Sequence, residues 1–249
     1  MKSVCLSDRG RVRQLNEDSC GVFTNTDGLT LAVVADGMGG HRAGDVASSM
    51  ATSLLKELWE QSKSIDSPEL AENWLREHIE QINQKLYKHS QDNSECQGMG
   101  TTVDAVICSP TFATIAHIGD SRCYLSNSNG FNLMTSDHTL VNELVKSGQI
   151  SKEDAEHHPR KNWILRALGT EPSVEMDIKT IILEEGDFLL LCSDGLTNKV
   201  QESELNEVLH TNEELQKKAE VLVQMANENG GEDNITLVIV QYSSMSESG

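Results

Sequence analysis

Three aspartates stand where strand-like runs of the sequence begin or end. Asp36 closes the apolar run LAVVA, Asp194 closes FLLLCS, and Asp233 comes directly before NITLVIV. A carboxylate at the mouth of a buried strand is costly to desolvate unless a positive charge meets it. Because Asp followed by Gly or Asn is also an ordinary turn former, the turn interpretation is the stronger one for any of these residues taken alone.

Three further acids change that balance. Glu17 and Asp18 in RQLNEDS and Asp120 in HIGDSR also lie beside expected sheet edges, and no matching set of Cys or His ligands accompanies them. A site built only from oxygen donors selects Mg²⁺ or Mn²⁺ rather than Zn²⁺. Two such ions about 4 Å apart can bind phosphoryl oxygens, hold a bridging hydroxide and neutralise a leaving group. The six acids together predict a two-metal site.

Composition and charge exclude several classes of protein. The chain has 249 residues, 37% of them hydrophobic, which is enough for the core of one large globular domain. Its formal net charge of -19 disfavours nucleic-acid binding and predicts that most acids are solvated surface. The opening MKSVCLSDRGR lacks the apolar stretch of a secretory signal, and no apolar run is long enough to span a membrane. We expect a cytoplasmic protein whose six cysteines are reduced and mostly buried.

Two amphipathic helices are predicted after the run that ends at Asp36. The first follows Gly44, and its apolar face repeats every fourth residue at Val46, Met50, Leu54 and Leu58. The second begins at Ser67-Pro68, a hydroxyl cap followed by proline in the first turn. Its expected buried residues are Leu70, Trp74, Ile82 and Leu86.

Strand-like runs fill much of the remaining chain. Those at 101–108, 111–118 and 121–125 are separated by Ser-Pro and Gly-Asp turn signals and predict an antiparallel meander. Strands return at 176–183, 188–192 and 235–240, with a helix before the last. Between them, 137–169 contains short helical pieces, including a capping box from Ser151 to Asp154, and is predicted to be an insertion near the site. Strands grouped apart from helices indicate an α+β fold.

Six short motifs, in this order, resemble those of the type 2C metal-dependent protein phosphatases, the PPM family. They are Arg13-x-x-Asn16-Glu17-Asp18, Val34-Ala35-Asp36-Gly37-Met38-Gly39-Gly40-His41, Gly98-Met99-Gly100-Thr101-Thr102, Gly119-Asp120-Ser121-Arg122, Ser193-Asp194-Gly195 and Asp233-Asn234. Each motif is weak alone. Their order and their spread from about residue 3 to residue 241 make the resemblance specific, and it is closest to the bacterial-type, single-domain members.

The resemblance implies a four-layer α-β-β-α sandwich of two mainly antiparallel sheets flanked by helix pairs. It also implies one catalytic domain at 1–243 with a small helical flap at about 137–169, followed by a short polar tail at 244–249. The implied activity is hydrolysis of phosphoserine and phosphothreonine by water or hydroxide bridging two Mn²⁺ or Mg²⁺ ions. The implied partners are phosphorylated proteins and a serine/threonine kinase, and we expect a monomer.

Residue by residue, the resemblance assigns metal ligands. Glu17, Asp36 and the Gly37 carbonyl would hold one ion, and Asp36, Asp194 and Asp233 would hold the other, so that Asp36 bridges. In bacterial-type relatives a third, weaker ion uses the aspartates that match Asp120 and Asp194. For Asp120 an equally good interpretation is that it braces the turn with Arg122.

Three other residues are candidates for catalysis. Asp18 would orient metal-bound water, and Arg13 would hold the substrate phosphate through its planar donor fork. Many eukaryotic members carry a His directly after the Asp-Gly pair as the proposed acid, where this chain has Met38. His41 could take that role, or it could be a loop residue that stabilises the glycine turn.

Rival chemistries fit the sequence less well. Cys5 to Arg11 has the C-x5-R spacing of cysteine-dependent phosphatases, but Asp8 lies inside that would-be anion cradle and no helical pattern follows it, so we expect Cys5 to be a core thiol of the first strand. Gly39 to Gly44 has P-loop glycine spacing but lacks the required Lys.

A non-catalytic domain that binds phosphoproteins remains the alternative, although no metal acid is lost. Asp104, in the apolar run TTVDAVI, has no assigned role.

Overall fold

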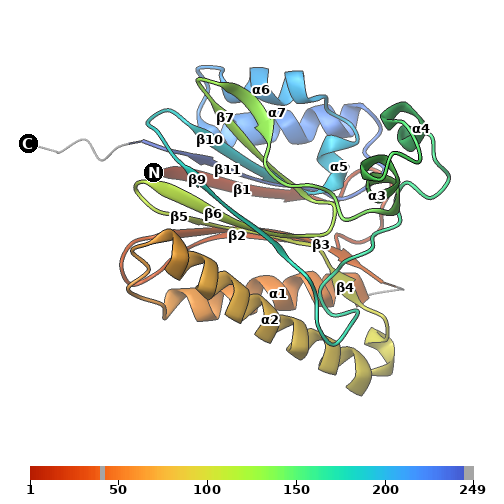
Figure 1. The fold of residues 1–249 in the computed structure, drawn as a ribbon. Coiled ribbons are helices and arrows are strands. Elements are labelled where there is room, and N and C mark those ends of the chain that lie inside the picture. Colours follow the sequence, from red (N-terminus) through yellow and green to blue (C-terminus); the bar gives the residue numbers. More distant parts are fainter. Residues whose placement is uncertain (40–42, 244–249) are drawn as a thin grey trace, which may run out of the picture.

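Two antiparallel sheets pack face to face in this computed structural model, which describes residues 1–39 and 43–243 (Figure 1). The first sheet has the strand order β1-β11-β10-β7-β8. Its strands are β1 (Lys2–Asp8), β7 (Arg122–Asn127), β8 (Gly130–Leu133), β10 (Phe188–Cys192) and β11 (Ile235–Gln241). The second sheet has the order β2-β3-β5-β6-β9, and β4 pairs with β3. Its strands are β2 (Asp18–Thr24), β3 (Thr30–Met38), β4 (Gly100–Thr101), β5 (Val103–Cys108), β6 (Phe112–Ile118) and β9 (Asp177–Ile182).

The central strands are apolar on both faces because each face is covered. In the β10–β11 pair, Leu191 is registered with Val238, and both belong to the apolar cluster between the sheets. The next residues along, Leu190 and Ile239, belong to the cluster under the helices. Successive side chains of a strand point to opposite faces, so a strand covered on both sides reads as a continuous apolar run.

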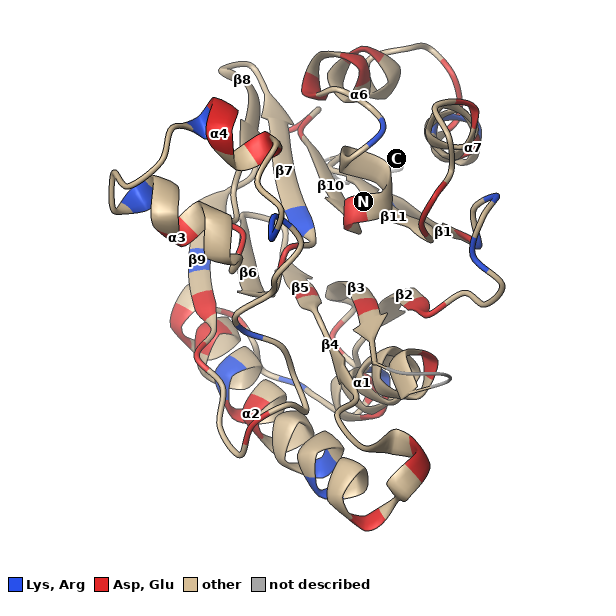
Figure 2. Cartoon of the chain, turned by 90° about the vertical axis from the view of Figure 1, so that its right-hand side faces the viewer, with Lys and Arg blue, Asp and Glu red and all other residues tan. Residues whose placement is uncertain are grey.

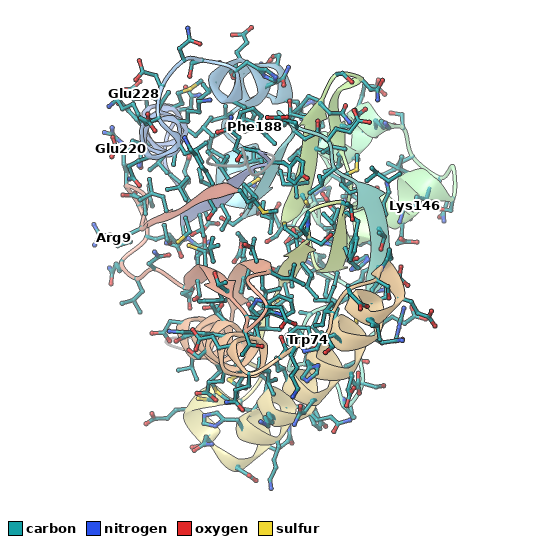
Figure 3. The ribbon with its side chains drawn as sticks, turned by 90° about the vertical axis from the view of Figure 1, so that its left-hand side faces the viewer. Arg9, Trp74, Lys146, Phe188, Glu220 and Glu228 are labelled. Atoms are coloured by element: carbon teal, nitrogen blue, oxygen red, sulfur yellow. The ribbon has the colours of Figure 1, made fainter. Side chains whose placement is uncertain are left out.

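Helices form the two outer layers. The second sheet is covered by α1 (Ala43–Glu60) and α2 (Pro68–Asp92), and the first by α5 (Asp194–Thr197), α6 (Glu202–Leu209) and α7 (Leu215–Glu228). Figure 3 labels Trp74 in one helix–sheet layer and Phe188 in the other. Trp74 meets Trp59 edge to face at 4.9 Å between ring centroids, and such a pair contributes about 0.5–1.5 kcal/mol beyond its buried area. The predicted four-layer α-β-β-α sandwich is confirmed.

The predicted start of the second helix is also confirmed, with one correction on its face. The Ser67 hydroxyl accepts a hydrogen bond from the Leu70 amide, and Pro68 occupies the first turn. Trp74, Ile82 and Leu86 are buried, but Leu70 is 43% exposed. The inward side of the first turn is instead taken by Ala71, since the helix face that meets the sheet starts one residue later.

The predicted meander is wrong at its third strand. β5 and β6 pair as expected, but β7 pairs with β10 in the first sheet. The turn from Gly119 to Ser121 therefore carries the chain from one sheet to the other. Gly119 has φ +112°, and a Cβ there would lie 2.5 Å from the Thr102 side chain, so this turn requires glycine. Asp120 stands at the crossing point.

Short helices lie outside the sandwich. The segment 137–169 contains α3 (Leu140–Lys146) and α4 (Lys152–Glu156), and α4 begins with the predicted capping box at Ser151. A single 3₁₀ turn, η1 (Ser94–Cys96), follows α2. Cys5 is exposed rather than a core thiol, because β1 is the edge strand of its sheet. None of the helices in the described part of the chain has both the length and the apolar character needed to cross a lipid bilayer.

Candidate active site

The predicted acids gather at one end of the two sheets. Asp18 is the first residue of β2 and is registered directly opposite Asp36 on β3. Asp194 begins α5 just after β10, and Asp233 comes just before β11. Figure 2 views this end of the molecule, with acidic positions on β2 and β3 and with α3 and α4 to one side. Strand ends from both sheets thus bring four sequence-distant carboxylates to one region.

Backbone hydrogen bonds hold Asp36 in place. Its N–H donates to Thr102 Oγ1 at 2.9 Å, and its carbonyl accepts from the Thr102 N–H at 2.8 Å and from Thr101 Oγ1 at 3.0 Å. The strand predicted to close at Asp36 continues to Met38, because Gly37 and Met38 pair with β4. The glycine- and threonine-containing motif at 98–102 therefore fixes the position of the expected bridging ligand.

Gly37 allows the Glu17 loop to approach that strand. The Gly37 N–H donates to the Glu17 carbonyl at 3.0 Å, and a Cβ at Gly37 would overlap both this carbonyl and that of Gly44. Only glycine permits the close approach. The structure thus holds the backbone of Glu17 against Gly37.

The acids raise one another's pKa values. Burial raises the pKa of Asp36 well above its ordinary value, and the charges of Asp18, Asp194, Asp120 and Asp233 raise it further. Burial is also the main cause that raises the pKa of Asp18 and of Asp194 to about 6 and that of Asp120 to about 7. A group of desolvated carboxylates that repel one another is stabilised by protons or by cations.

Arg13 is the cation that the chain itself brings to this group. Its guanidinium donates to Asp233 Oδ2 at 2.7 Å and lies 4.0 Å from Glu17 Oε2. Although burial opposes it, the Asp233 charge raises the pKa of Arg13. The Arg13 side chain is 47% exposed, so its guanidinium lies at the rim of the site and not beneath it.

Two acids have neutral hydrogen-bond donors. Asp18 Oδ2 accepts from the Ser193 hydroxyl at 2.8 Å, and Ser193 Oγ accepts in turn from the Thr236 amide at 3.0 Å. Asp194 Oδ2 accepts from the Asn198 side-chain amide at 3.1 Å. These contacts orient the carboxylates without neutralising them.

Asn234 has a positioning role that the sequence did not assign. Its Oδ1 accepts from the Glu17 N–H at 2.8 Å, while its Nδ2 donates to the carbonyls of Arg9 and Leu15 at 2.8 and 2.9 Å. One side chain thus closes the loop that carries Arg13 and Glu17 against the start of β11. The Asp233-Asn234 motif was the sequence feature that could have indicated this role. The hydrogen-bond partners of Asn234, however, are more than two hundred residues away in the sequence.

The donor set fits hard divalent cations. All the predicted ligands are oxygens, and Glu17 Oε1 is buried with no hydrogen-bond partner among the described residues. Burial also raises the pKa of Glu17 although Arg13 opposes the shift. Within the described ranges, no three His, Cys, Asp or Glu side chains already form a metal-binding cluster. The ion pair of Asp233 with Arg13 and the bond of Asp194 with Asn198 turn two of the carboxylates toward other partners.

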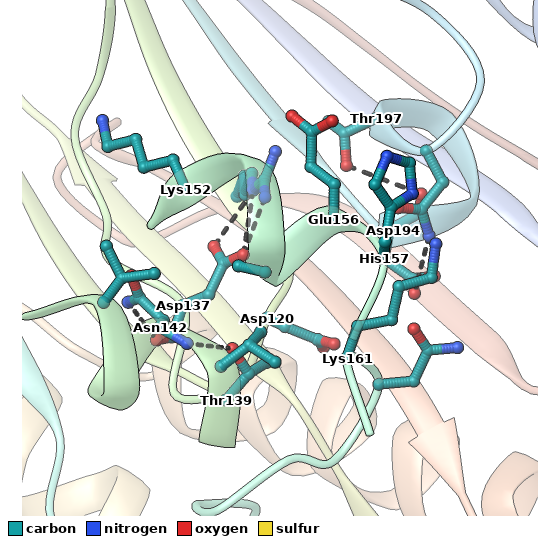
Figure 4. A pocket seen from close by; sticks show the side chains of 16 residues that line it. Asp120, Asp137, Thr139, Asn142, Lys152, Glu156, His157, Lys161, Asp194 and Thr197 are labelled. Carbon is teal, nitrogen blue, oxygen red and sulfur yellow. Dashed lines mark hydrogen bonds and ion pairs between the residues drawn. The ribbon is translucent and has the colours of Figure 1, made fainter. Parts of the chain in front are cut away.

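A cavity of about 600 Å³ opens beside the acids, between the sandwich and the segment that contains α3 and α4. Asp120 and Asp194 line it on the sandwich side, and Figure 4 shows them together with Lys152 and Lys161. Arg122 also lines it, but its guanidinium pairs with Asp137 at 2.7 Å. Of the two interpretations of Asp120, the brace with Arg122 is not formed, because Arg122 pairs with Asp137 instead.

His41 lies outside the described residues, so the structure does not place the candidate acid. All other predicted site residues lie at this end of the sheets. Asp120 borders the cavity, whereas Arg13 and Glu17 belong to the loop between β1 and β2.

The fold and its acidic end together define a class, that of α-β-β-α sandwich proteins with buried carboxylates gathered at one end of their sheets. The sequence matches Protein phosphatase 2C over residues 8–236, and the chain belongs to that family. It is 48% identical over 239 residues to the serine/threonine phosphatase stp of Listeria welshimeri. The aligned region covers 96% of this chain and 95% of the relative.

Solved structures agree with this assignment. The serine/threonine phosphatase of S. agalactiae superposes with a TM-score of 0.93 at 40% identity, over 97% of this chain and 99% of that chain. The catalytic domain of the serine threonine protein phosphatase PstP, solved in complex with two manganese ions, superposes with a TM-score of 0.83 at 33% identity over 96% of each chain.

Proposed function

We propose that this chain is a metal-dependent protein phosphatase that hydrolyses phosphoserine and phosphothreonine monoesters. The observation that carries the proposal is the convergence of mutually repelling, desolvated carboxylates at one end of the sandwich. Two findings on similar proteins support it: the relatives are serine/threonine phosphatases, and one of them was solved in complex with two manganese ions.

In this proposal the residues divide between two Mn²⁺ or Mg²⁺ ions. Glu17, Asp36 and the Gly37 carbonyl would hold one ion, and Asp36, Asp194 and Asp233 would hold the other. When bound, the two ions would supply Lewis-acid polarisation of the phosphoryl group and of an attacking water. A third, weaker ion would use Asp120 with Asp194.

The chain's own groups then act on substrate and solvent. Arg13 turns from Asp233 to bind the phosphate through its donor fork, which its exposed position allows. Asp18, whose Oδ2 accepts from the Ser193 hydroxyl, orients the attacking water. We assign His41, from its place in the sequence alone, as the proton donor to the departing alkoxide.

The remaining parts of the proposal concern the whole chain. Residues 1–243 form one catalytic domain, 137–169 is its flap over the cavity, and 244–249, outside the described residues, is a short tail. Phosphorylated proteins are the substrates, and we propose that the chain opposes a serine/threonine kinase, acts as a monomer and works in the cytoplasm.

The deciding experiment is phosphate release from a phosphothreonine peptide and from an aryl phosphate, with Mn²⁺, with Mg²⁺ and after chelation. We expect both substrates to be hydrolysed only with metal. Asp36→Asn, which keeps the side-chain shape, is the matched inactive control. Peptide binding without phosphate release in Mn²⁺ would support the non-catalytic alternative and overturn the proposal.

A further inference from the structure

A buried ion pair lies beneath the turn that carries Asp120. Asp104 on β5 and His117 on β6 are directly opposite each other in the sheet, and Asp104 Oδ1 lies 2.6 Å from His117 Nδ1. Both side chains are almost completely buried, with 0% and 2% of their surface exposed. Neither residue belongs to the group of proposed metal ligands. The pair accounts for the acid that looks out of place in the apolar run 101–108.

Each ring nitrogen of His117 has a hydrogen-bond partner. Nδ1 faces the Asp104 carboxylate, and Nε2 lies 3.3 Å from the Ser136 carbonyl, so both nitrogens meet acceptors. The pKa agrees in direction, because the Asp104 charge raises it although burial opposes the shift. His117 thus fastens Ser136, the residue just before the flap segment, to the second sheet.

His138 packs on this pair and binds the turn at Gly119 in two ways. The His138 and His117 rings lie 4.6 Å apart between centroids. The His138 N–H donates to the Gly119 carbonyl at 2.7 Å, and its Nδ1 accepts from the Gly119 N–H at 3.1 Å. The carbonyl of His138 also accepts from the Leu165 N–H at 2.7 Å. One buried residue therefore joins both ends of the flap segment to the residue that precedes Asp120.

The other side of the same turn is held by Thr102. Gly119 packs against the Thr102 side chain, whose hydroxyl accepts from the Asp36 N–H at 2.9 Å and contacts Ser121 Oγ at 2.8 Å. A shift of Gly119 would therefore displace Asp120 directly and press on the residue that fixes Asp36. Hydrogen bonds of His138 to Gly119 and of Thr102 to Asp36 and Ser121, together with the packing of Gly119 on Thr102, link the flap segment to the carboxylates.

We propose that His138 is a positioning residue that couples the flap segment to the metal ligands through Gly119 and Thr102, with the Asp104–His117 pair as its anchor. The inference rests on the proposed function in that it treats Asp36 and Asp120 as ligands. His138 touches neither substrate nor ion, and it acts by fixing where Asp120 and Asp36 lie. Loosening it weakens metal binding and frees both ends of the flap together.

Two variants separate the positioning contact from mere packing. In His138→Asn the side-chain oxygen can take the place of Nδ1 and accept from Gly119, whereas in His138→Gln the polar group extends toward the place of Nε2 and leaves the Gly119 amide unpaired. Losing the partner of a buried amide should weaken Mn²⁺ binding of the Gln variant about tenfold, with the Asn variant close to the parent. Asp177→Asn, which alters the exposed contacts of Asp177 with His138 Nε2 at 3.3 Å and with Arg166 at 3.4 Å, is the control and should bind Mn²⁺ like the parent.

The measurements are calorimetric Mn²⁺ titration of the chelator-treated proteins and amide hydrogen exchange. We expect faster exchange at 119–121, 136–142 and 163–166 in the Gln variant only. Asn and Gln variants with equal Mn²⁺ affinity, or a Gln variant that loses heat stability alone, would overturn the proposal. If neither variant folds, Asp104→Asn replaces them and should weaken Mn²⁺ binding in the same direction, and parent-like binding would overturn the coupling. A parent that binds Mn²⁺ but releases no phosphate would count against the proposed function and not against the coupling.

Discussion

The guanidinium of Arg13 lies between two acids that we assign to the metal ions, which makes it the counter-charge that the chain supplies to its own site. It contacts Asp233 directly and Glu17 at longer range. A phosphate that enters beside bound cations offers this exposed guanidinium a new partner with better-matched geometry. The same residue thus serves the metal-free chain and the proposed substrate complex.

Replacing Arg13 by Ala should raise the KM for a phosphopeptide about tenfold and change kcat much less, since the fork binds the phosphate in ground and transition states alike. Steady-state kinetics with saturating Mn²⁺ measure both constants. Arg9→Ala is the matched control, because Arg9 belongs to the same loop but donates only to the Gln14 carbonyl. A KM equal to the parent's would make Arg13 a structural residue.

The role of His41 is tested by the leaving group. His41→Ala should slow phosphoserine hydrolysis about a hundredfold, but aryl phosphate much less, because only the serine alkoxide needs a proton as it departs. His89→Ala, at the end of α2, is a control that should affect neither substrate. Equal losses on both substrates would leave His41 as a loop residue.

The last residue of β4, Thr101, and the residue that follows it, Thr102, do more than connect two strands. Thr101 and Thr102 bind the Asp36 backbone from both sides, and Thr102 also reaches the turn between the sheets. These two residues therefore link Asp36, near the end of β3, to the turn that leads into the other sheet.

Thr102→Val keeps the side-chain shape but removes the hydroxyl. It should lower the free energy of unfolding by about 1–2 kcal/mol, because the Asp36 amide loses its acceptor, and it should weaken Mn²⁺ binding. Thr114→Val is the matched control, since Thr114 is equally buried in the second sheet and bonds Thr180 away from the acids. Denaturant unfolding and Mn²⁺ titration of both variants separate the two effects. Equal Mn²⁺ affinity for both variants would remove Thr102 from the site.

Local patterns predicted most elements, and contacts between distant segments account for what they missed. The Ser67 cap, the Ser151 capping box and the apolar strands were readable because each depends on neighbouring residues. The crossing of β7 to the other sheet depends on the turn at Gly119, and nothing in the run 121–125 signals its partner.

The same distinction applies to the site. Acid positions at strand ends predicted that the carboxylates gather in one region, and the order of the motifs is the basis of the proposed ligand set. The Arg122–Asp137 pair and the hold of Asn234 on the Glu17 loop join residues far apart in the sequence, so no local spacing could indicate them. The role of Asp104 depends on the pairing of β5 with β6, which places it opposite His117.

For the whole molecule, the carboxylate cluster should make stability depend on pH in a direction opposite to that of most proteins. The folded pKa values of Asp18 and Asp194 are about 6 and that of Asp120 about 7, all raised from the ordinary 3.8. A carboxyl with a raised folded pKa contributes stability that is fully present below the unfolded pKa and is lost as pH rises through the folded value. The window lies between about pH 4 and pH 7.

Lowering the pH from 8 to 6 in chelator should therefore raise the free energy of unfolding by roughly 2 kcal/mol from these three groups. Denaturant melts at the two pH values measure it. The gain should disappear with saturating Mn²⁺, because the cations then compensate the charges that protons would remove. A metal-free protein that loses stability over this interval would contradict the raised pKa values.

We propose that the acids are held together against their own repulsion in order to bind cations, and thermal melting of the parent and of Asp36→Asn with and without Mn²⁺ can decide this. The variant keeps the shape of the side chain and removes one charge from the cluster. In chelator it should melt at the same temperature as the parent or higher, and it should have no measurable turnover. In excess Mn²⁺ the order should reverse, because only the parent gains the full stabilisation from ions that bind the folded state. A variant clearly less stable than the parent in chelator would show instead that Asp36 is a structural turn residue.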